Sequence, residues 1–314
     1  MRMEIAQFIR EIGRGKQGAK DLSRDQACEL MTAILDESAN PIAVGAFCIA
    51  MRIKGETSEE MLGFLDAIHG QLQRFTHTNA KPVVVLPSYN GSRRLPLLTP
   101  LLAQLLARQG HAVLVHGCSS EDQRVNAEDV LSAMGIHAAS QVGTIKEGEV
   151  VVAPTQLLSP ALWKLLQVRR QTGLRNSAHS LVKLMNVVNG PSLLLSSYTH
   201  PEYASAMLTS LQVLKANAVV LRGTEGEPVA DPRKVPAMRC LVRGELAPYL
   251  DIVSQTHHQT TDLPMHMTAE QNAHYITAML NGTIAIPPSV QTQADLISRL
   301  SLACTNLTSH PFSP

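Results

Sequence analysis

The chain has 314 residues, of which 45% are hydrophobic and 17% are charged, and its formal net charge is +1 at pH 7. This composition excludes an intrinsically disordered chain, and the length favours two globular domains. No apolar run approaches the roughly 20 residues that cross a bilayer, and the first residues have no apolar stretch of the signal-peptide kind. We therefore expect a globular protein outside the membrane, and the net charge alone predicts no polyanionic partner.

The cysteines are odd in number, widely scattered and without a CxxC pair. Such a set favours reduced thiols over a disulfide framework, and it makes a structural zinc site improbable. We expect a cytoplasmic protein. The five positions are Cys28, Cys48, Cys118, Cys240 and Cys304.

The first segment has the signals of successive helices. Ser23 and Gln26 form a capping box before an apolar face with helical spacing. Asn40-Pro41 begins the next helix, Gly55 ends it, and Thr57 begins a third that runs to about residue 73. The pattern predicts a small all-helical domain over residues 1–76, with helices of about 160–190 as a candidate addition.

From Lys81 onward, short apolar runs alternate with helical segments. Residues 82–86 have the pattern of a buried strand, and a turn at 88–91 leads to a helix over about 97–109. This order predicts an α/β domain over residues 77–314, with a mainly parallel sheet flanked by helices. The further strands are expected at 112–115, 150–153, 192–196 and 217–222, and the further helices at 126–134, 160–172, 177–187, from 201, at 268–280 and at 291–303.

Open parallel sheets bind ligands at the carboxyl ends of their strands. The loops after residues 86, 115, 153 and 221 should therefore line one site. The candidate phosphate-binding residues in these loops are Asn90, Gly91, Arg93, Arg94, His116 and Arg222.

Charge is unevenly distributed along this nearly neutral chain. Residues 150–201 contain no Asp or Glu, and a second basic stretch surrounds a glycine-rich turn near the N-terminus. A positive face steers anionic ligands, whereas neighbouring acids that fold back would neutralise it, and the residues leave both interpretations open. The candidates are Arg169, Arg170, Arg175, His179 and Lys183 in the first stretch and Arg14, Lys16 and Lys20 in the second.

Several segments resemble the anthranilate phosphoribosyltransferases. The run "AILDESANPIAVGAFCIAMRIKGETSEE" is similar to their helical N-terminal domain, "VHGCSS" followed by "NAEDVLSAMG" is similar to their "KHGNR" region, and "VRRQTGLRN" is similar to their "VRRELGVRT". The resemblance covers about the first 245 residues and implies their two-domain fold and a dimer formed through the N-terminal helical domain.

The same resemblance shows where the chain departs from the family. The glycine-rich "GTGGD" loop, which brings backbone N–H groups to the pyrophosphate of phosphoribosyl pyrophosphate, aligns with residues 87–94, where Gly91 is the glycine that remains. The family's Asp-Glu metal pair aligns with Pro228 and Val229, although Glu225 and Glu227 lie close by. Losing these groups removes charge stabilisation that the family's reaction needs.

The segments "SYNG", "VHG" and "RGTEGE" resemble the divergent YbiB-type subgroup of the family. That resemblance implies a dimeric, sequence-nonspecific DNA- or RNA-binding protein without evident transferase activity and without a cofactor. Arginine forks grip phosphate without a metal, which agrees with the gain of Arg93, Arg94 and Arg222. The alternatives are an active phosphoribosyltransferase that uses phosphoribosyl pyrophosphate, Mg²⁺ and anthranilate or an unknown acceptor, and a sensor that keeps a nucleotide pocket without turnover.

Overall fold

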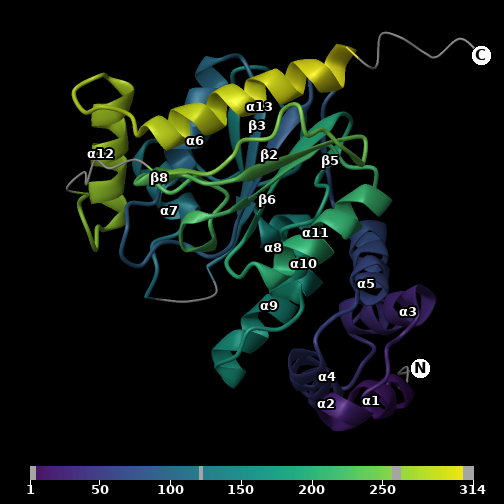
Figure 1. Cartoon of the computed structure of the whole chain (residues 1–314). Coiled ribbons are helices and arrows are strands. Elements are labelled where there is room, and N and C mark those ends of the chain that lie inside the picture. The colour runs from purple at the N-terminus through teal and green to yellow at the C-terminus, as the bar shows by residue number, and fades with distance from the viewer. Residues whose placement is uncertain (1–4, 120–122, 257–262, 307–314) are drawn as a thin grey trace, which may run out of the picture. The chain divides into compact units, whose positions relative to one another are not determined.

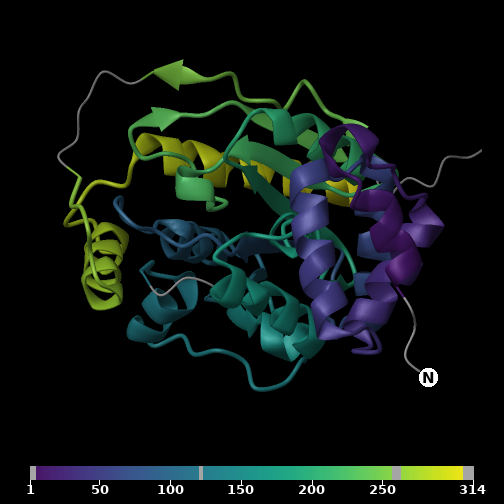
Figure 2. The same ribbon diagram turned by 90° about the horizontal axis from the view of Figure 1, so that it is seen from below.

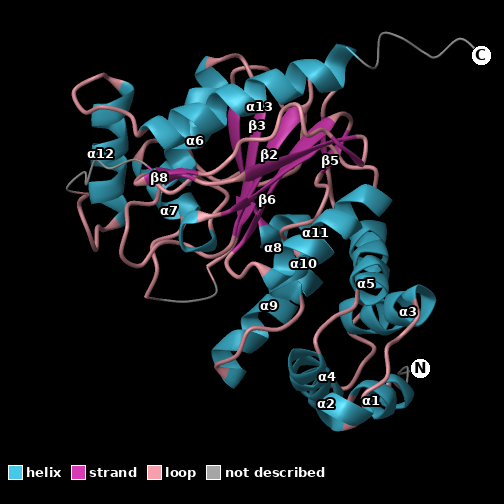
Figure 3. Ribbon diagram, viewed as in Figure 1, coloured by secondary structure: helices cyan, strands magenta, loops and turns pink. Residues whose placement is uncertain are grey.

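The structure is a computed structural model and describes residues 5–119, 123–256 and 263–306. It divides into two compact units (Figure 1). The first unit comprises Met1–Gln73 and Thr155–Met185, and the second comprises Arg74–Pro154 and Asn186–Pro314. Helices form the first unit and a mainly parallel sheet with helices forms the second (Figure 3). This confirms the predicted α/β class.

The first unit begins with helices whose start signals were readable in the sequence. The side chains of Ser23, Asn40 and Thr57 accept hydrogen bonds from backbone N–H groups of the first turn, as predicted. Figure 2 shows the N-terminal helices gathered together, and α1 contacts α4 while α3 contacts α5. The helices of this unit are α1 (Ala6–Ile12), α2 (Gly15–Gly18), α3 (Arg24–Leu35), α4 (Pro41–Lys54), α5 (Ser58–Gln71), α8 (Thr155–Leu158), α9 (Pro160–Thr172) and α10 (Ala178–Leu181).

An aromatic pair and a buried ion pair hold these helices together. The rings of Phe47 and Phe64 meet edge to face with centroids 5.7 Å apart. Glu60 is fully buried, and its carboxylate accepts hydrogen bonds from Lys54 Nζ at 2.8 Å and from the Leu22 amide at 2.9 Å. Because the charge is both paired and hydrogen-bonded, its burial is tolerated.

The second unit contains a seven-stranded sheet in the order β10-β9-β7-β6-β2-β3-β4. Strands β2, β3, β4, β6 and β7 run parallel to their neighbours, while β9 is antiparallel to β7 and β10 is antiparallel to β9. The strands of this unit are β1 (Phe75–Thr76), β2 (Val83–Ser88), β3 (Val113–Gly117), β4 (Val150–Pro154), β5 (Val188–Asn189), β6 (Ser192–Tyr198), β7 (Ala218–Arg222), β8 (Lys234–Val235), β9 (Met238–Val242), β10 (Glu245–Leu246) and β11 (Gln255–Thr256).

One face of this sheet carries the main core of the unit. Val84, Leu195 and Val219 belong to a buried cluster that also takes in residues of α6 (Thr99–Arg108), α7 (Ala127–Ala133), α12 (Ala269–Leu280) and α13 (Pro288–Asn306). Side chains alternate between faces along a strand, so Val85 and Val220 point to the other face. Helix α11 (Glu202–Val213) contacts β6 and β7 and contributes nothing to that cluster.

Some predicted boundaries were wrong. The helix expected at 177–187 ends at Leu181, because the next backbone bonds, such as Lys183 N–H to Ser180 C=O, span three residues and tighten the last turn. Strands β8 to β11 were not predicted, since two-residue strands have no readable period and the pattern of β9 is not a regular alternation.

Within the described part of the chain, no helix combines the length and apolarity needed to span a membrane. All five cysteines are free.

Candidate functional site

Two loops meet at the carboxyl edge of the sheet. Strands β2 and β7 lie on either side of β6 and run parallel to it, so the loops that follow them leave the sheet at the same edge. The first loop covers residues 88–95 and the second covers residues 223–227. Two glutamates of the second loop bind the backbone of the first.

Glu227 is the more deeply buried of these glutamates, with 1% of its surface exposed. Its carboxylate accepts hydrogen bonds from the amides of Asn90 and Gly91, both at 2.8 Å, and from the Thr99 hydroxyl at 2.9 Å. The Ser88 hydroxyl donates a further, short hydrogen bond to the same carboxylate. Four uncharged donors therefore satisfy a buried carboxylate, as burial of a charged group requires.

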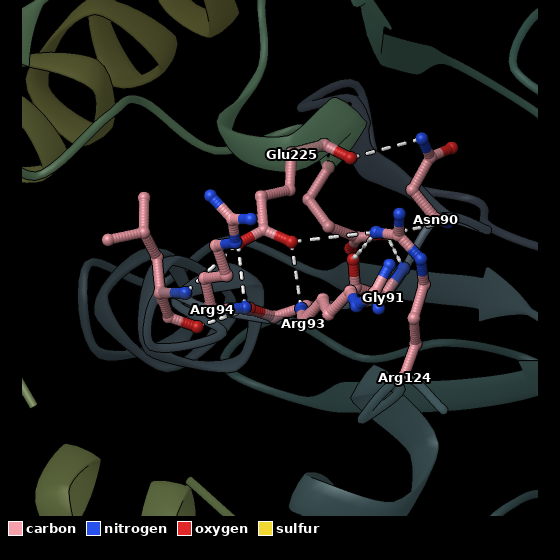
Figure 4. A network of polar contacts seen from close by, with 9 residues as sticks. Asn90, Gly91, Arg93, Arg94, Arg124 and Glu225 are labelled. Atoms are coloured by element: carbon pink, nitrogen blue, oxygen red, sulfur yellow. Dashed lines mark hydrogen bonds and ion pairs between the residues drawn. The ribbon is translucent and has the colours of Figure 1, made fainter. Parts of the chain in front are cut away.

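Glu225 binds the next part of the same loop (Figure 4). Its carboxylate accepts hydrogen bonds from the amide of Arg93 at 2.7 Å and from those of Arg94 and Leu95 at 2.9 Å. Arg124 Nη1 lies 3.5 Å from it. Burial acts to raise the pKa of Glu225, but the three backbone hydrogen bonds and the charge of Arg124 outweigh burial and lower the pKa below its usual value. Glu225 is therefore an anion at neutral pH.

Two glycines of these loops lie close to other segments. Gly91 has a φ of +62°, and a Cβ on it would lie 2.6 Å from the Val125 carbonyl oxygen. Gly226 has a φ of +91°, and a Cβ on it would lie 2.0 Å from Asn90 Nδ2. Both positions combine a left-handed backbone with a close approach, which is to the segment that contains Val125 at Gly91 and to the Asn90 side chain at Gly226, so both favour glycine.

We call the N–H groups of residues 90, 91, 93, 94 and 95 the amide cradle. It lies in the loop that the sequence aligns with the family's pyrophosphate-binding glycines. Each of its N–H groups donates to Glu225 or Glu227. The side chains of Arg93 and Arg94 are exposed, as is Arg222 at the end of β7.

The position of the family's metal pair does not fit a magnesium ion. Pro228 and Val229 have no side-chain ligand atoms, and their carbonyl oxygens accept hydrogen bonds from Gln293 and Thr224. Over residues 5–119, 123–256 and 263–306, no group of three or more His, Cys, Asp or Glu side chains is placed to hold a metal.

His116 lies inside the protein. Its Nδ1 is 2.8 Å from the Tyr89 hydroxyl, and none of its surface is exposed. Burial lowers the pKa of His116 to about 3, so the ring is neutral at pH 7. In this structure neither His116 nor the buried Tyr89 presents a surface to an outside ligand.

Three of the predicted basic residues of the first unit lie near His179. Burial, followed by the positive charges of Arg175, Arg169 and Lys183, lowers the pKa of His179 to about 3. Arg170 is exposed, Arg169 and Arg175 are half-buried, and Lys183 is 6% exposed. We call Arg169, Arg170, Arg175 and Lys183 the basic cluster.

The N-terminal basic stretch is organised differently from the sequence prediction. Residues 15–18 form the short helix α2, so the glycine-rich segment is not an open turn. Arg14 lies 3.1 Å and Lys20 lies 3.4 Å from the carboxylate of Glu11, which partly neutralises them. Lys16 lies within α2.

Sequence reasoning missed what the two glutamates do. It considered Glu225 and Glu227 only as substitutes for metal ligands, whereas both bind backbone amides. It also overlooked Arg124, whose Nη1 lies 3.3 Å from the Gly91 carbonyl oxygen. One sequence signal could have indicated this role of the glutamates. The segment "EGE" follows soon after the buried strand β7, and the loop with the amide cradle leaves the sheet at the same carboxyl edge.

Comparisons with known proteins agree with this fold. Residues 6–70 match the helical bundle domain of a glycosyl transferase family. The chain is 37% identical over 297 residues to the uncharacterized protein YbiB of Escherichia coli (strain K12), and the aligned region covers 93% of this chain and 92% of YbiB. It is 31% identical over 244 residues to the anthranilate phosphoribosyltransferase of Symbiobacterium thermophilum, and the aligned region covers 74% of this chain and 69% of the enzyme.

The fold is also that of solved enzymes. The anthranilate phosphoribosyltransferase of Thermus thermophilus superposes with a TM-score of 0.68 at 20% identity, covering 96% of this chain and 90% of that one. The Saccharomyces cerevisiae enzyme in complex with PRPP and Mg gives a TM-score of 0.67 at 12% identity, covering 98% and 89%. The chain therefore belongs to the glycosyl transferase family that contains the anthranilate phosphoribosyltransferases and YbiB.

Proposed function

We propose that this chain is a sequence-nonspecific nucleic-acid-binding protein that contacts phosphate groups of DNA or RNA. The observation that carries this proposal is the basic cluster. Its four cations come from a stretch of 52 residues, 150–201, that contains no acid, and three of them lie close enough to His179 to lower its pKa. The three arginines are exposed or half-buried and can contact phosphate, whereas the buried Lys183 contributes only its charge. Concentrated positive charge of this kind favours phosphate contacts that read no base sequence.

The amide cradle argues against the transferase alternative. A transferase of this family would use such N–H groups for the pyrophosphate of its substrate. Here Glu225 and Glu227 bring negative charge to the same groups, so a pyrophosphate would have to displace a carboxylate and would also meet its charge. The hydrogen bonds from the amide cradle to the two glutamates therefore favour a protein that binds phosphate through exposed arginines and disfavour a phosphoribosyltransferase.

A titration of a fluorescent oligonucleotide of arbitrary sequence at several salt concentrations tests the proposal. If the three arginines of the basic cluster each contact one phosphate of duplex DNA, the logarithm of the affinity falls with the logarithm of the salt concentration with a slope of about −3. Two oligonucleotides of unrelated sequence should bind alike. Absence of binding at low salt, or binding that ignores salt, would reject the proposal. Turnover of phosphoribosyl pyrophosphate with anthranilate and Mg²⁺ would support the transferase instead.

We also propose that the chain forms a homodimer through α4 of the helical unit. Ile42, Ile49 and Ile53 are 83%, 36% and 55% exposed and lie along one face of α4, with Ala46 between them. Their spacing of i, i+7 and i+11 makes a continuous apolar stripe, which a second helix can cover. Asp36 is exposed before the start of α4 and Arg52 near its end, so antiparallel pairing of two copies of α4 about a two-fold axis would bring opposite charges together.

The double substitution Ile49→Glu/Ile53→Glu should convert the dimer to a monomer. Four carboxylates brought together in one two-fold interface repel each other and lose the apolar contact. Light scattering at micromolar concentration should then report the 34.0 kDa chain mass in place of twice that value.

A matched control is Val213→Glu/Leu302→Glu, which changes two apolar side chains that are 48% and 60% exposed in the other unit. The control should remain dimeric. If the α4 variant keeps the mass of the unmodified protein, the dimer does not use this stripe.

A further inference from the structure

Within the amide cradle, the two glutamates are held in different ways. Glu227 is buried among four donors, two of which are hydroxyl groups of Ser88 and Thr99. The Glu225 side chain is 19% exposed, and the N–H groups that hold it belong to residues 93–95 at the surface end of the loop. Glu227 is therefore part of the folded core, whereas Glu225 lies at the solvent boundary.

The backbone at Glu225 is also in a conformation that glutamate rarely adopts. Its φ is +50° and its ψ is 19°, in the left-handed region. Strain of this kind persists only where other contacts impose it. The contacts at Glu225 include the three hydrogen bonds of its carboxylate and one from Asn90 Nδ2 to its carbonyl oxygen, so the residue occupies its position against a local backbone preference.

The surroundings of the Glu225 carboxylate are those of an anion site. Three successive backbone N–H groups converge on it, and concave sets of such groups bind phosphate and similar anions. The guanidinium of Arg124 lies 3.5 Å away, and the side chains of Arg93 and Arg94 begin at the same backbone. Donors of this number and charge suit a tetrahedral oxyanion as well as a carboxylate.

We propose that Glu225 is a built-in occupant of a phosphate-class anion site formed by the N–H groups of residues 93–95 with Arg124. An outside phosphate group binds there only when the Glu225 carboxylate leaves. The carboxylate thus blocks the cradle in an autoinhibitory contact. This inference is independent of nucleic-acid binding, because it concerns a single oxyanion and one side chain.

The substitution Glu225→Gly tests this directly. Glycine removes the carboxylate and accepts the positive φ without strain, so the backbone at position 225 keeps its conformation. Glu225→Gln keeps the side-chain volume, removes the charge and should give an intermediate result. Glu245→Ala, at an exposed position in β10, changes the net charge equally and is the matched control.

Binding of inorganic phosphate and of pyrophosphate is measured by calorimetry at constant ionic strength. Amide chemical shifts of Arg93, Arg94 and Leu95 locate the site. We expect Glu225→Gly to bind either anion at least tenfold more tightly than the unmodified protein, with those three amides shifting.

Three results would overturn the inference. They are a folded Glu225→Gly protein that binds phosphate no more tightly than the unmodified chain, a gain that Glu245→Ala reproduces, and a gain that leaves the three amides unshifted. An oligonucleotide affinity that is unchanged in Glu225→Gly would leave the anion result standing, so this test and that of the proposed function fail separately.

Discussion

The substitution Glu227→Ala should destabilise the second unit by about 3 kcal/mol. It removes the acceptor of four hydrogen bonds and leaves the N–H groups of Asn90 and Gly91 and the hydroxyls of Ser88 and Thr99 without their partner in a buried place. Hydrogen bonds to a charged group contribute roughly 1.5–3 kcal/mol each, and the total is less than their sum because the carboxylate no longer has to be desolvated.

Urea unfolding followed by circular dichroism measures this loss of free energy of unfolding. The slope of that free energy against urea concentration should be the same in the variant and the unmodified protein, which shows that both unfold in the same way. Hydrogen exchange of the backbone amides in the segment 83–99 should become faster, because Ser88 at the end of β2 and Thr99 at the start of α6 both donate hydrogen bonds to Glu227. Glu245→Ala should change stability by no more than about 0.5 kcal/mol, as surface substitutions usually do. Equal effects of the two substitutions would contradict the role of Glu227.

Reversal of two charges in the basic cluster should have the largest effect on nucleic-acid binding. We expect Arg170→Glu/Arg175→Glu to weaken oligonucleotide affinity by roughly 100-fold at low salt. The slope of the logarithm of affinity against the logarithm of salt concentration should become shallower by about 2, which corresponds to the loss of two phosphate contacts. The loss should be the same for unrelated base sequences, because phosphate contacts carry no sequence information.

The control for this pair is Lys146→Glu/Arg299→Glu, which changes the net charge equally at two positions of the second unit. Fluorescence anisotropy at two or more salt concentrations separates a lost contact from a general change of charge. If both pairs weaken binding equally, affinity follows the net charge of the chain and the basic cluster has no particular part in it.

The amide cradle and the basic cluster differ in how their charges and donors are satisfied. In the second unit, the N–H groups suited to phosphate are bound by carboxylates of the chain itself. In the first unit, cations gather in a segment without acids. This difference is the basis for proposing that the chain holds an extended polyanion and does not transfer a sugar phosphate.

The sequence by itself determined most of the longer elements of this fold. Capping residues such as Ser23, Asn40 and Thr57 act on amides within three residues of themselves, so their effect is local and readable. The runs that form β2 and β7 are buried on both faces and read as unbroken apolar segments. The loss of the glycine-rich loop and of the metal pair was also visible in the sequence alone, through the family resemblance.

Only the tertiary structure decided which groups the charged residues of the site bind. Glu225 and Glu227 bind amides that lie 130 or more positions earlier in the chain, and no local pattern links them. The pairing follows from the strand order β7-β6-β2, which puts the two loops at one edge of the sheet. Likewise, His116 and Lys183 were candidate contacts by residue type but are buried. Burial depends on packing between distant segments, and residue type and periodicity do not specify it.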